Sequence, residues 1–266
     1  MGYKAFEPGM ICRGKQYAEN TVFEETGADG CCQAGVMHYC EEPLDCLDYY
    51  PLVDDKGKIT EFAEVEPLAE VLKKGNNRAT KKLRIGAKLP LKDLINAQVD
   101  IQMEKGNNET AASGYGSQLA ASGDGSRLAA SGYGSQLAAS GDGSKLAASG
   151  GGSQLVASGD ASKLAASGYG SKLAASGDGS RLAASGYGSQ LAASGYGSKL
   201  AASGANSVAA AIGENSMVSA SLGSWIVLAE YDEYLKPLCV RAAQIDGKKL
   251  KPNVFYTLKN GEFVEV

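Results

Sequence analysis

Apolar and polar positions repeat every nine residues through the middle of the chain, from Ala111 to about Ala211, in the unit Ala-Ala-Ser-Gly-x-Gly-Ser-x-Leu. Within each Ser-x-Leu-Ala-Ala stretch the pattern has the period of two that is typical of a β-strand, so Ser117, Leu119 and Ala121 should share one face. A helix is excluded, because nine residues make two and a half helical turns and each unit holds two glycines. The pattern therefore predicts short strands that are joined by Gly-x-Gly turns.

A second period, twice as long, is superimposed on this unit. The residue between the two glycines mostly alternates between tyrosine and aspartate, as in Tyr115, Asp124, Tyr133 and Asp142. This alternation has a physical meaning if two nonapeptides close one coil, because equivalent residues of neighbouring coils then touch. Disorder is the alternative for a segment so rich in Gly, Ser and Ala, but a flexible segment does not need leucine at a constant phase. We therefore predict a mainly β protein built on a parallel β-solenoid of 18-residue coils, with two nonapeptides in each coil.

Stacked coils would sort the exposed side chains into columns, which form the candidate binding surface. One edge should carry an acidic column and, three residues further along each unit, a basic column that neutralises it. The acidic column comprises Asp124, Asp142, Asp160 and Asp178, and the basic column comprises Arg127, Lys145, Lys163 and Arg181. The opposite edge should present Tyr115, Tyr133, Tyr169 and Tyr187 beside glutamines such as Gln118 and Gln136, and Tyr196 follows as a further candidate.

Less regular sequence flanks the repeats, which divides the chain into residues 1–107, 108–222 and 223–266. The first part mixes short alternating stretches with a Pro43 helix and a second short helix over residues 91–98, so it predicts a small α+β domain. In the last part Asp246-Gly247 and Asn260-Gly261 are strong hairpin signals. This part should form a small antiparallel β cap that protects the end of the solenoid.

Charge and hydropathy narrow the possible partners and locations. The net charge is −4 with both signs interspersed, so direct nucleic-acid binding is not expected. No apolar run approaches the roughly 20 residues that cross a bilayer, so we expect no membrane association. The first residues lack the pattern of a secretory signal, and we therefore expect a cytoplasmic protein.

The cysteine pattern does not predict a metal site. Cys32, His38, Cys40 and Cys46 could supply zinc ligands, but they contain no C-x-x-C pair. Reduced and buried thiols are the favoured interpretation. Calcium is excluded as well, because each repeat holds at most one carboxylate and a calcium site needs six or more oxygens.

Three segments of the first domain, residues 12–14, 34–40 and 62–66, resemble the ADP-ribosyltransferase family in their order: a basic residue on an early strand, a strand that enters a helix, and a late glutamate. The resemblance implies an NAD site. In that site Arg13 would hold the phosphates, His38 or Tyr39 would lie under the nicotinamide, and Glu64 or Glu66 would orient the acceptor.

Two further resemblances concern larger parts of the chain. The motifs C-R-G-x-Q-Y at residues 12–17 and G-x-x-H-Y-C-x-x-P-x-D-x-L-D-Y-Y at residues 35–50, with segments 223–230 and 256–261, resemble a family of uncharacterised proteins from gut Firmicutes and their phages. That family implies no activity. Residues 206–218 resemble the head repeats of trimeric autotransporter adhesins, which implies β-roll geometry there.

These observations favour a non-enzymatic binding or scaffold protein without a cofactor. A rigid solenoid between the first domain and the cap would present its columns to a protein partner. The resemblance to phage proteins implies that this partner is a host defence protein such as a CRISPR effector. Two alternatives stay open: an NAD-dependent ADP-ribosyltransferase carried on the first domain, and a homo-oligomeric structural protein.

Overall fold

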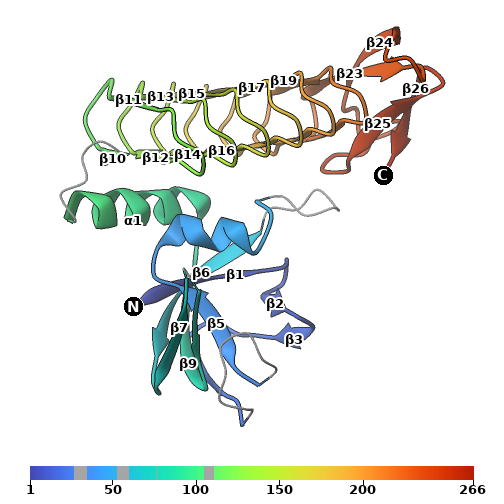
Figure 1. Cartoon of the computed structure of the whole chain (residues 1–266). Coiled ribbons are helices and arrows are strands. Elements are labelled where there is room, and N and C mark those ends of the chain that lie inside the picture. The colour runs from blue at the N-terminus through green and yellow to red at the C-terminus, as the bar shows by residue number, and fades with distance from the viewer. Residues whose placement is uncertain (27–34, 53–59, 76, 105–110) are drawn as a thin grey trace.

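A computed structural model describes the chain except for residues 27–34, 53–59, 76 and 105–110. It confirms a mainly β protein with a parallel β-solenoid, a small α+β region at the N-terminus and antiparallel strands at the C-terminus (Figure 1). We call the N-terminal region the head and the C-terminal strands the cap.

The head is a sheet of seven antiparallel strands in the order β4-β9-β6-β1-β5-β8-β7. The strands are β1 (Gly2–Phe6), β4 (Thr21–Glu24), β5 (Met37–Cys40), β6 (Glu61–Pro67), β7 (Val71–Lys74), β8 (Asn77–Thr80) and β9 (Lys82–Leu89), and β2 (Ile11–Cys12) and β3 (Lys15–Gln16) form a separate hairpin. All five residues of β1 are buried, because β1 lies inside the sheet with side chains packed on both faces. The sheet therefore has two apolar faces, and each needs a cover.

Two helical segments cover one of these faces. The 3₁₀ helix η1 (Pro43–Asp48) begins at a proline, and the α-helix α1 (Leu91–Glu104) begins directly after Pro90. Leu44 of η1 and Leu94 of α1 pack with Phe62 of β6 in one buried cluster. The second helix is longer than the predicted stretch 91–98, because its next turns pack on the solenoid.

The solenoid has two parallel sheets. The first, which we call the covered sheet, contains β10 (Ala111–Ala112), β12 (Arg127–Ala130), β14 (Lys145–Ala148), β16 (Lys163–Ala166), β18 (Arg181–Ala184), β20 (Lys199–Ala202) and β22 (Met217–Ala220). The second, the uncovered sheet, contains β11 (Gln118–Ala121), β13 (Gln136–Ala139), β15 (Gln154–Ala157), β17 (Lys172–Ala175), β19 (Gln190–Ala193), β21 (Val208–Ala211) and β23 (Trp225–Tyr231). Leu119 pairs with Leu137, and Leu128 pairs with Leu146. The coil therefore has eighteen residues, as the Tyr/Asp alternation predicts.

A thin core of leucine and alanine lies between the two sheets, and Leu155 is fully buried in it. The turns need glycine for two different reasons. A Cβ at Gly141 would lie 2.3 Å from the carbonyl oxygen of Gly123 in the coil below, so only glycine allows the coils to stack. Gly143 has φ of +65°, a conformation that other residues resist. The Ser144 hydroxyl then donates to the Gly141 carbonyl at 2.6 Å, which satisfies a buried acceptor.

The cap closes the far end of the solenoid. β24 (Pro237–Gln244) pairs antiparallel with β23, while β25 (Tyr256–Lys259) pairs with β22 and forms a hairpin with β26 (Glu262–Glu265). Ile245, Tyr256 and Leu258 belong to the same buried cluster as the leucine core. They shield the last coil from water.

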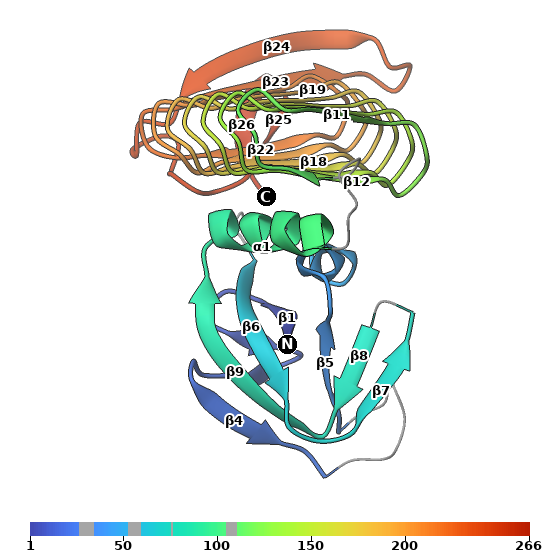
Figure 2. The same cartoon turned by 90° about the vertical axis from the view of Figure 1, so that its left-hand side faces the viewer.

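The head is not held away from the cap by the solenoid, although the sequence predicts that the solenoid separates the two. It lies along the side of the solenoid, and η1 and α1 are sandwiched between the head sheet and the covered sheet (Figures 1 and 2). The buried cluster that contains Leu44 and Leu94 also contains Ala147 and Ala165 of the covered sheet and Phe255 of the cap. The alanine column of the covered sheet is thus the docking face for the head.

Candidate functional site

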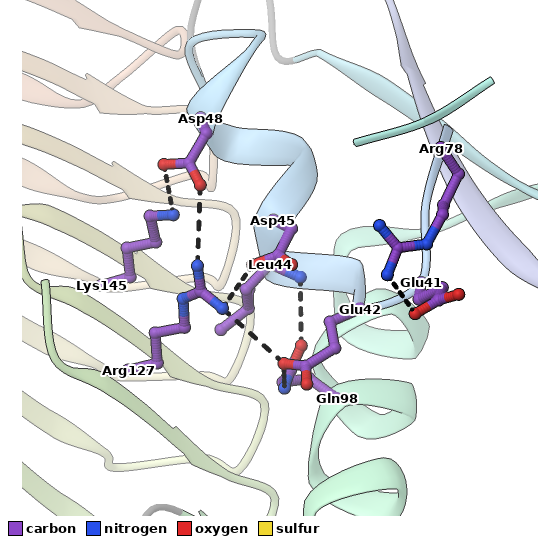
Figure 3. Close-up of polar contacts among 9 residues, drawn as sticks. All are labelled: Glu41, Glu42, Leu44, Asp45, Asp48, Arg78, Gln98, Arg127 and Lys145. Atoms are coloured by element: carbon purple, nitrogen blue, oxygen red, sulfur yellow. Dashed lines mark hydrogen bonds and ion pairs between the residues drawn. The ribbon is translucent and has the colours of Figure 1, made fainter. Parts of the chain in front are cut away.

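The basic column of the covered sheet holds the head in place. Arg127 Nη1 lies 2.5 Å from Asp45 Oδ1, and Arg127 Nη2 lies 3.6 Å from Asp48 Oδ2 (Figure 3). Lys145 Nζ lies 2.5 Å from Asp48 Oδ1, and Lys163 Nζ donates to the Leu47 carbonyl oxygen at 2.6 Å. These three basic residues therefore belong to an internal interface and not to the predicted partner-binding surface.

Desolvation sets the electrostatics of this interface. Burial raises the pKa of the Asp45 carboxyl, and the neighbouring Arg127 opposes that shift. Burial also lowers the pKa of Lys163, with Lys145 as a further cause. Gln98 of α1 bridges the two helical segments, since it accepts from the Leu44 amide and donates to Glu42, each at 3.1 Å (Figure 3). Asp45 Oδ1 is buried and has no hydrogen-bond donor among the described residues, so its ion pair with Arg127 is what compensates it.

The sequence predicts that the basic column neutralises the acidic column, but the two columns make no direct ion pairs among the described residues. Among the described residues, no ion pair joins Asp124, Asp142, Asp160 or Asp178 to a basic residue of the solenoid. Asp142 Oδ1 instead accepts the backbone N–H of Asp160 at 2.8 Å, and Asp160 does the same for Asp178. The column stabilises the turn edge by satisfying one amide per coil, and this explains why aspartates can stack.

The tyrosine column is exposed and partly stacked. The rings of Tyr115 and Tyr133 are 5.6 Å apart and 13° from parallel, and those of Tyr169 and Tyr187 are 5.6 Å apart and 5° from parallel. Gly151 separates the two pairs. Tyr196 stands on the opposite edge above the acidic column, because its amide donates to Asp178 Oδ1 at 2.7 Å. The tyrosines offer flat apolar contact area to solvent.

Beside this column lies the outer face of the uncovered sheet, which we call the uncovered face. Its residues are Gln118, Gln136, Gln154, Lys172 and Gln190, then Ala120, Ala138, Val156, Ala174, Ala192 and Ala210, and then Ser122, Ser140, Ser158, Ser176 and Ser194. Shallow hollows of about 490 and 330 Å³ lie over its alanine and serine columns. Val156 at its centre is 51% exposed, whereas Ala147 in the covered sheet is 1% exposed. The same repeat thus makes one face that the head covers and one face on which no described residue of the head or cap packs.

A pocket of about 360 Å³ in the head contains some of the residues assigned to the NAD alternative. Arg13, His38 and Tyr39 line it, whereas the described lining does not include Glu64 or Glu66. Glu66 Oε2 instead lies 3.3 Å from Arg84 Nη1. Burial, together with Lys4 and Arg13, lowers the pKa of His38 to about 4, so the imidazole is neutral at pH 7. The structure therefore does not assemble the predicted transferase constellation.

The structure describes three of the four residues considered as zinc ligands. The fourth, Cys32, lies outside the described residues. Within the described residues, no group of three His, Cys, Asp or Glu side chains is arranged to hold a metal ion, and Cys12, Cys40, Cys46 and Cys239 are free thiols.

No helix in the described parts of the chain combines the length and the apolar character needed to cross a bilayer.

Sequence reasoning missed the acidic partners of the basic column. Glu42, Asp45 and Asp48 recur at intervals of three residues, which places them on one side of a 3₁₀ helix. An acidic row of this kind could pair with the basic column of the repeats, and it was the available signal in the sequence. Lys4, buried beneath the pocket, carried no recognisable signal.

The comparisons with known proteins bear on the head alone. Residues 1–97 match the family model described as "Domain of unknown function (DUF7666)". No curated protein and no solved structure matches the chain. The expected likenesses to ADP-ribosyltransferases, to autotransporter adhesins and to phage proteins thus find no support in these comparisons.

Proposed function

We propose that the protein is a non-enzymatic binding or scaffold protein whose uncovered face, flanked by the tyrosine column, takes a protein partner. The observation that supports this is the difference between the two sheets of the solenoid. Both are built from the same Leu-Ala-Ala strands, but α1 and η1 pack on one and nothing in the described chain packs on the other. A surface of this kind already binds a folded element within this molecule.

The chemistry of the uncovered face defines its partner. The covered sheet begins most of its strands with Arg or Lys and binds an acidic element, whereas the uncovered sheet begins most of its strands with glutamine. Small alanine and serine side chains allow a helix or strand to approach closely. The partner segment should therefore be apolar at its centre and uncharged at its rim, with aromatic contacts along the tyrosine column. A polyanion is disfavoured, because Lys172 is the one cation among the residues of this face.

The proposal is tested by blocking the face. Val156→Arg and Ala174→Arg place long charged side chains at the centre of the uncovered face without touching the core. We expect a partner that the wild-type chain retains from a host lysate to be lost from both variants. It should be kept by Lys73→Gln, a change of charge at an exposed residue of the head. Retention by the arginine variants would contradict the proposal.

The partner class is tested in the same experiment. Mass spectrometry would identify the retained protein, and we expect a host defence protein such as a CRISPR effector. A homo-oligomer would show instead as concentration-dependent assembly of the purified chain in light scattering, abolished by Val156→Arg. In that case the face would bind a second copy and not a different protein.

A further inference from the structure

The head pocket contains a buried cation that the proposed function does not use. Lys4 lines the pocket although its residue is 5% exposed, and its ammonium donates to the His38 carbonyl oxygen at 2.7 Å. The Phe6 and Tyr17 rings lie 5.6 and 5.5 Å from Lys4 Nζ. Burial lowers the pKa of Lys4, and the neighbouring thiols of Cys12, Cys46 and Cys40, which also line the pocket, oppose that shift. A buried ammonium without a carboxylate is unfavourable unless something else compensates it.

A second cation stands at the mouth of the same pocket. Arg13 occupies the turn of the β2–β3 hairpin with φ of +51°, a region that non-glycine residues avoid. It is exposed and makes no ion pair or hydrogen bond within the part of the chain that the structure describes.

The charges of the described lining do not cancel. Glu25 is its one carboxylate, and that carboxylate pairs with Lys15. Lys4 and Arg13 are therefore left with two positive charges, since His38 is neutral at pH 7. The remaining lining is rich in aromatic rings, namely Tyr17, Tyr39, Tyr49 and Tyr50. A volume of about 360 Å³ is at the small end of ligand pockets.

We propose that the head pocket binds a small organic anion, a carboxylate or phosphate monoester attached to a single flat ring, with Lys4 as the buried anchor, Arg13 at the mouth and the tyrosine rings along the sides. An anion beside Lys4 favours the ammonium form, so binding weakens as the pH rises through the pKa of Lys4. This site is separate from the uncovered face, and its failure would leave the proposed function intact.

The test uses the full chain with phenyl phosphate and benzoate as probes and with benzyl alcohol and inorganic phosphate as comparators. His38 is the single histidine of the chain and lines the pocket, so its imidazole NMR signals report on binding directly. We expect the ring-bearing anions to shift these signals at lower concentration than either comparator. The dissociation constant of phenyl phosphate, measured by calorimetry at increasing pH, should rise as Lys4 loses its proton.

Variants separate the pocket from general charge effects. Arg13→Gln should weaken phenyl phosphate binding about tenfold, Lys4→Met should weaken it at least as much, and Lys73→Gln outside the pocket should leave it unchanged. If Lys4→Met fails to fold, as judged by circular dichroism, phenyl phosphate binding by Arg13→Gln provides the test, because Arg13 is exposed. Equal binding by wild type and Arg13→Gln, or no response of His38 to millimolar phenyl phosphate, overturns the proposal.

Discussion

Arg127 of the solenoid strand β12 lies 2.5 Å from Asp45 of the head, whose side chain is 7% exposed. The contact joins two parts of the chain that are built on unrelated patterns, a coil repeat and an irregular α+β sheet. It fixes which of the two solenoid sheets is covered, because only the covered sheet carries a basic column. The uncovered sheet, on which the proposed function rests, is a consequence of this pairing.

Removal of that arginine should loosen the head from the solenoid. Arg127→Ala leaves the Asp45 carboxylate buried without its nearest cation, and we expect a loss of about 3 kcal/mol in the free energy of unfolding, measured by urea denaturation. Arg181→Ala is the matched control, since Arg181 has the same position in β18 and no ion pair to the head among the described residues. It should lose less than about 0.5 kcal/mol. Equal losses would show that Arg127 acts through the repeat and not through Asp45.

The two glycines of one turn should respond differently to alanine. A Cβ at Gly177 would lie 2.2 Å from the Gly159 carbonyl oxygen, so Gly177→Ala must push two coils apart and should cost about 3 kcal/mol or more. Gly179 has φ of +63° and open space around it, so Gly179→Ala should cost only about 1 kcal/mol. Ala161 already occupies the equivalent position with φ of +54°. Urea denaturation compares the two variants, and a larger loss at Gly179 would contradict this account of the turn.

Adjacent residues of β15 test which side of the strand faces the core. Leu155 is fully buried and Val156 is 51% exposed. Leu155→Ala should therefore cost about 3 kcal/mol because it leaves a cavity in a thin core. Val156→Ala should change stability by less than about 0.5 kcal/mol. The midpoints of chemical denaturation decide this, and a reversed order would mean that the strand faces the other way.

His38 should make the head sensitive to acid. Its pKa falls from 6.5 in the unfolded chain to about 4 in the folded head, mainly through burial and further through Lys4 and Arg13. The folded state holds the neutral imidazole, so the stability that His38 contributes is complete above about pH 6.5 and is lost as the pH falls toward 4. The difference corresponds to at most about 3 kcal/mol.

An NMR titration of this single histidine should therefore give a midpoint near pH 4, and His38→Gln should flatten the dependence of unfolding free energy on pH between 6.5 and 4. Carboxylates also contribute to the pH dependence of stability in this range. Their contribution persists in the variant, so the difference between the two curves reports on His38. An unshifted midpoint would show that the imidazole is solvated.

Much of the fold could be predicted because the repeat is a local pattern. The phase of Leu119 and its equivalents specifies which residues face the core, and the alternation of Tyr115 with Asp124 specifies the coil length. Both follow from the geometry of a strand and from contact between neighbouring coils. The tyrosine column is a direct consequence of that register, so the sequence was sufficient to place it.

The role of Arg127, Lys145 and Lys163 could not be read in the same way. Their column looks like a solvated edge in the sequence, and it becomes an internal interface only because Asp45 and Asp48, far away along the chain, are brought against it. The same holds for Lys4, whose burial depends on strands that meet only in the folded head. Repetition determined the solenoid, whereas the tertiary structure alone decided which of its two faces the head covers, because docking depends on charges and volumes that no local period encodes.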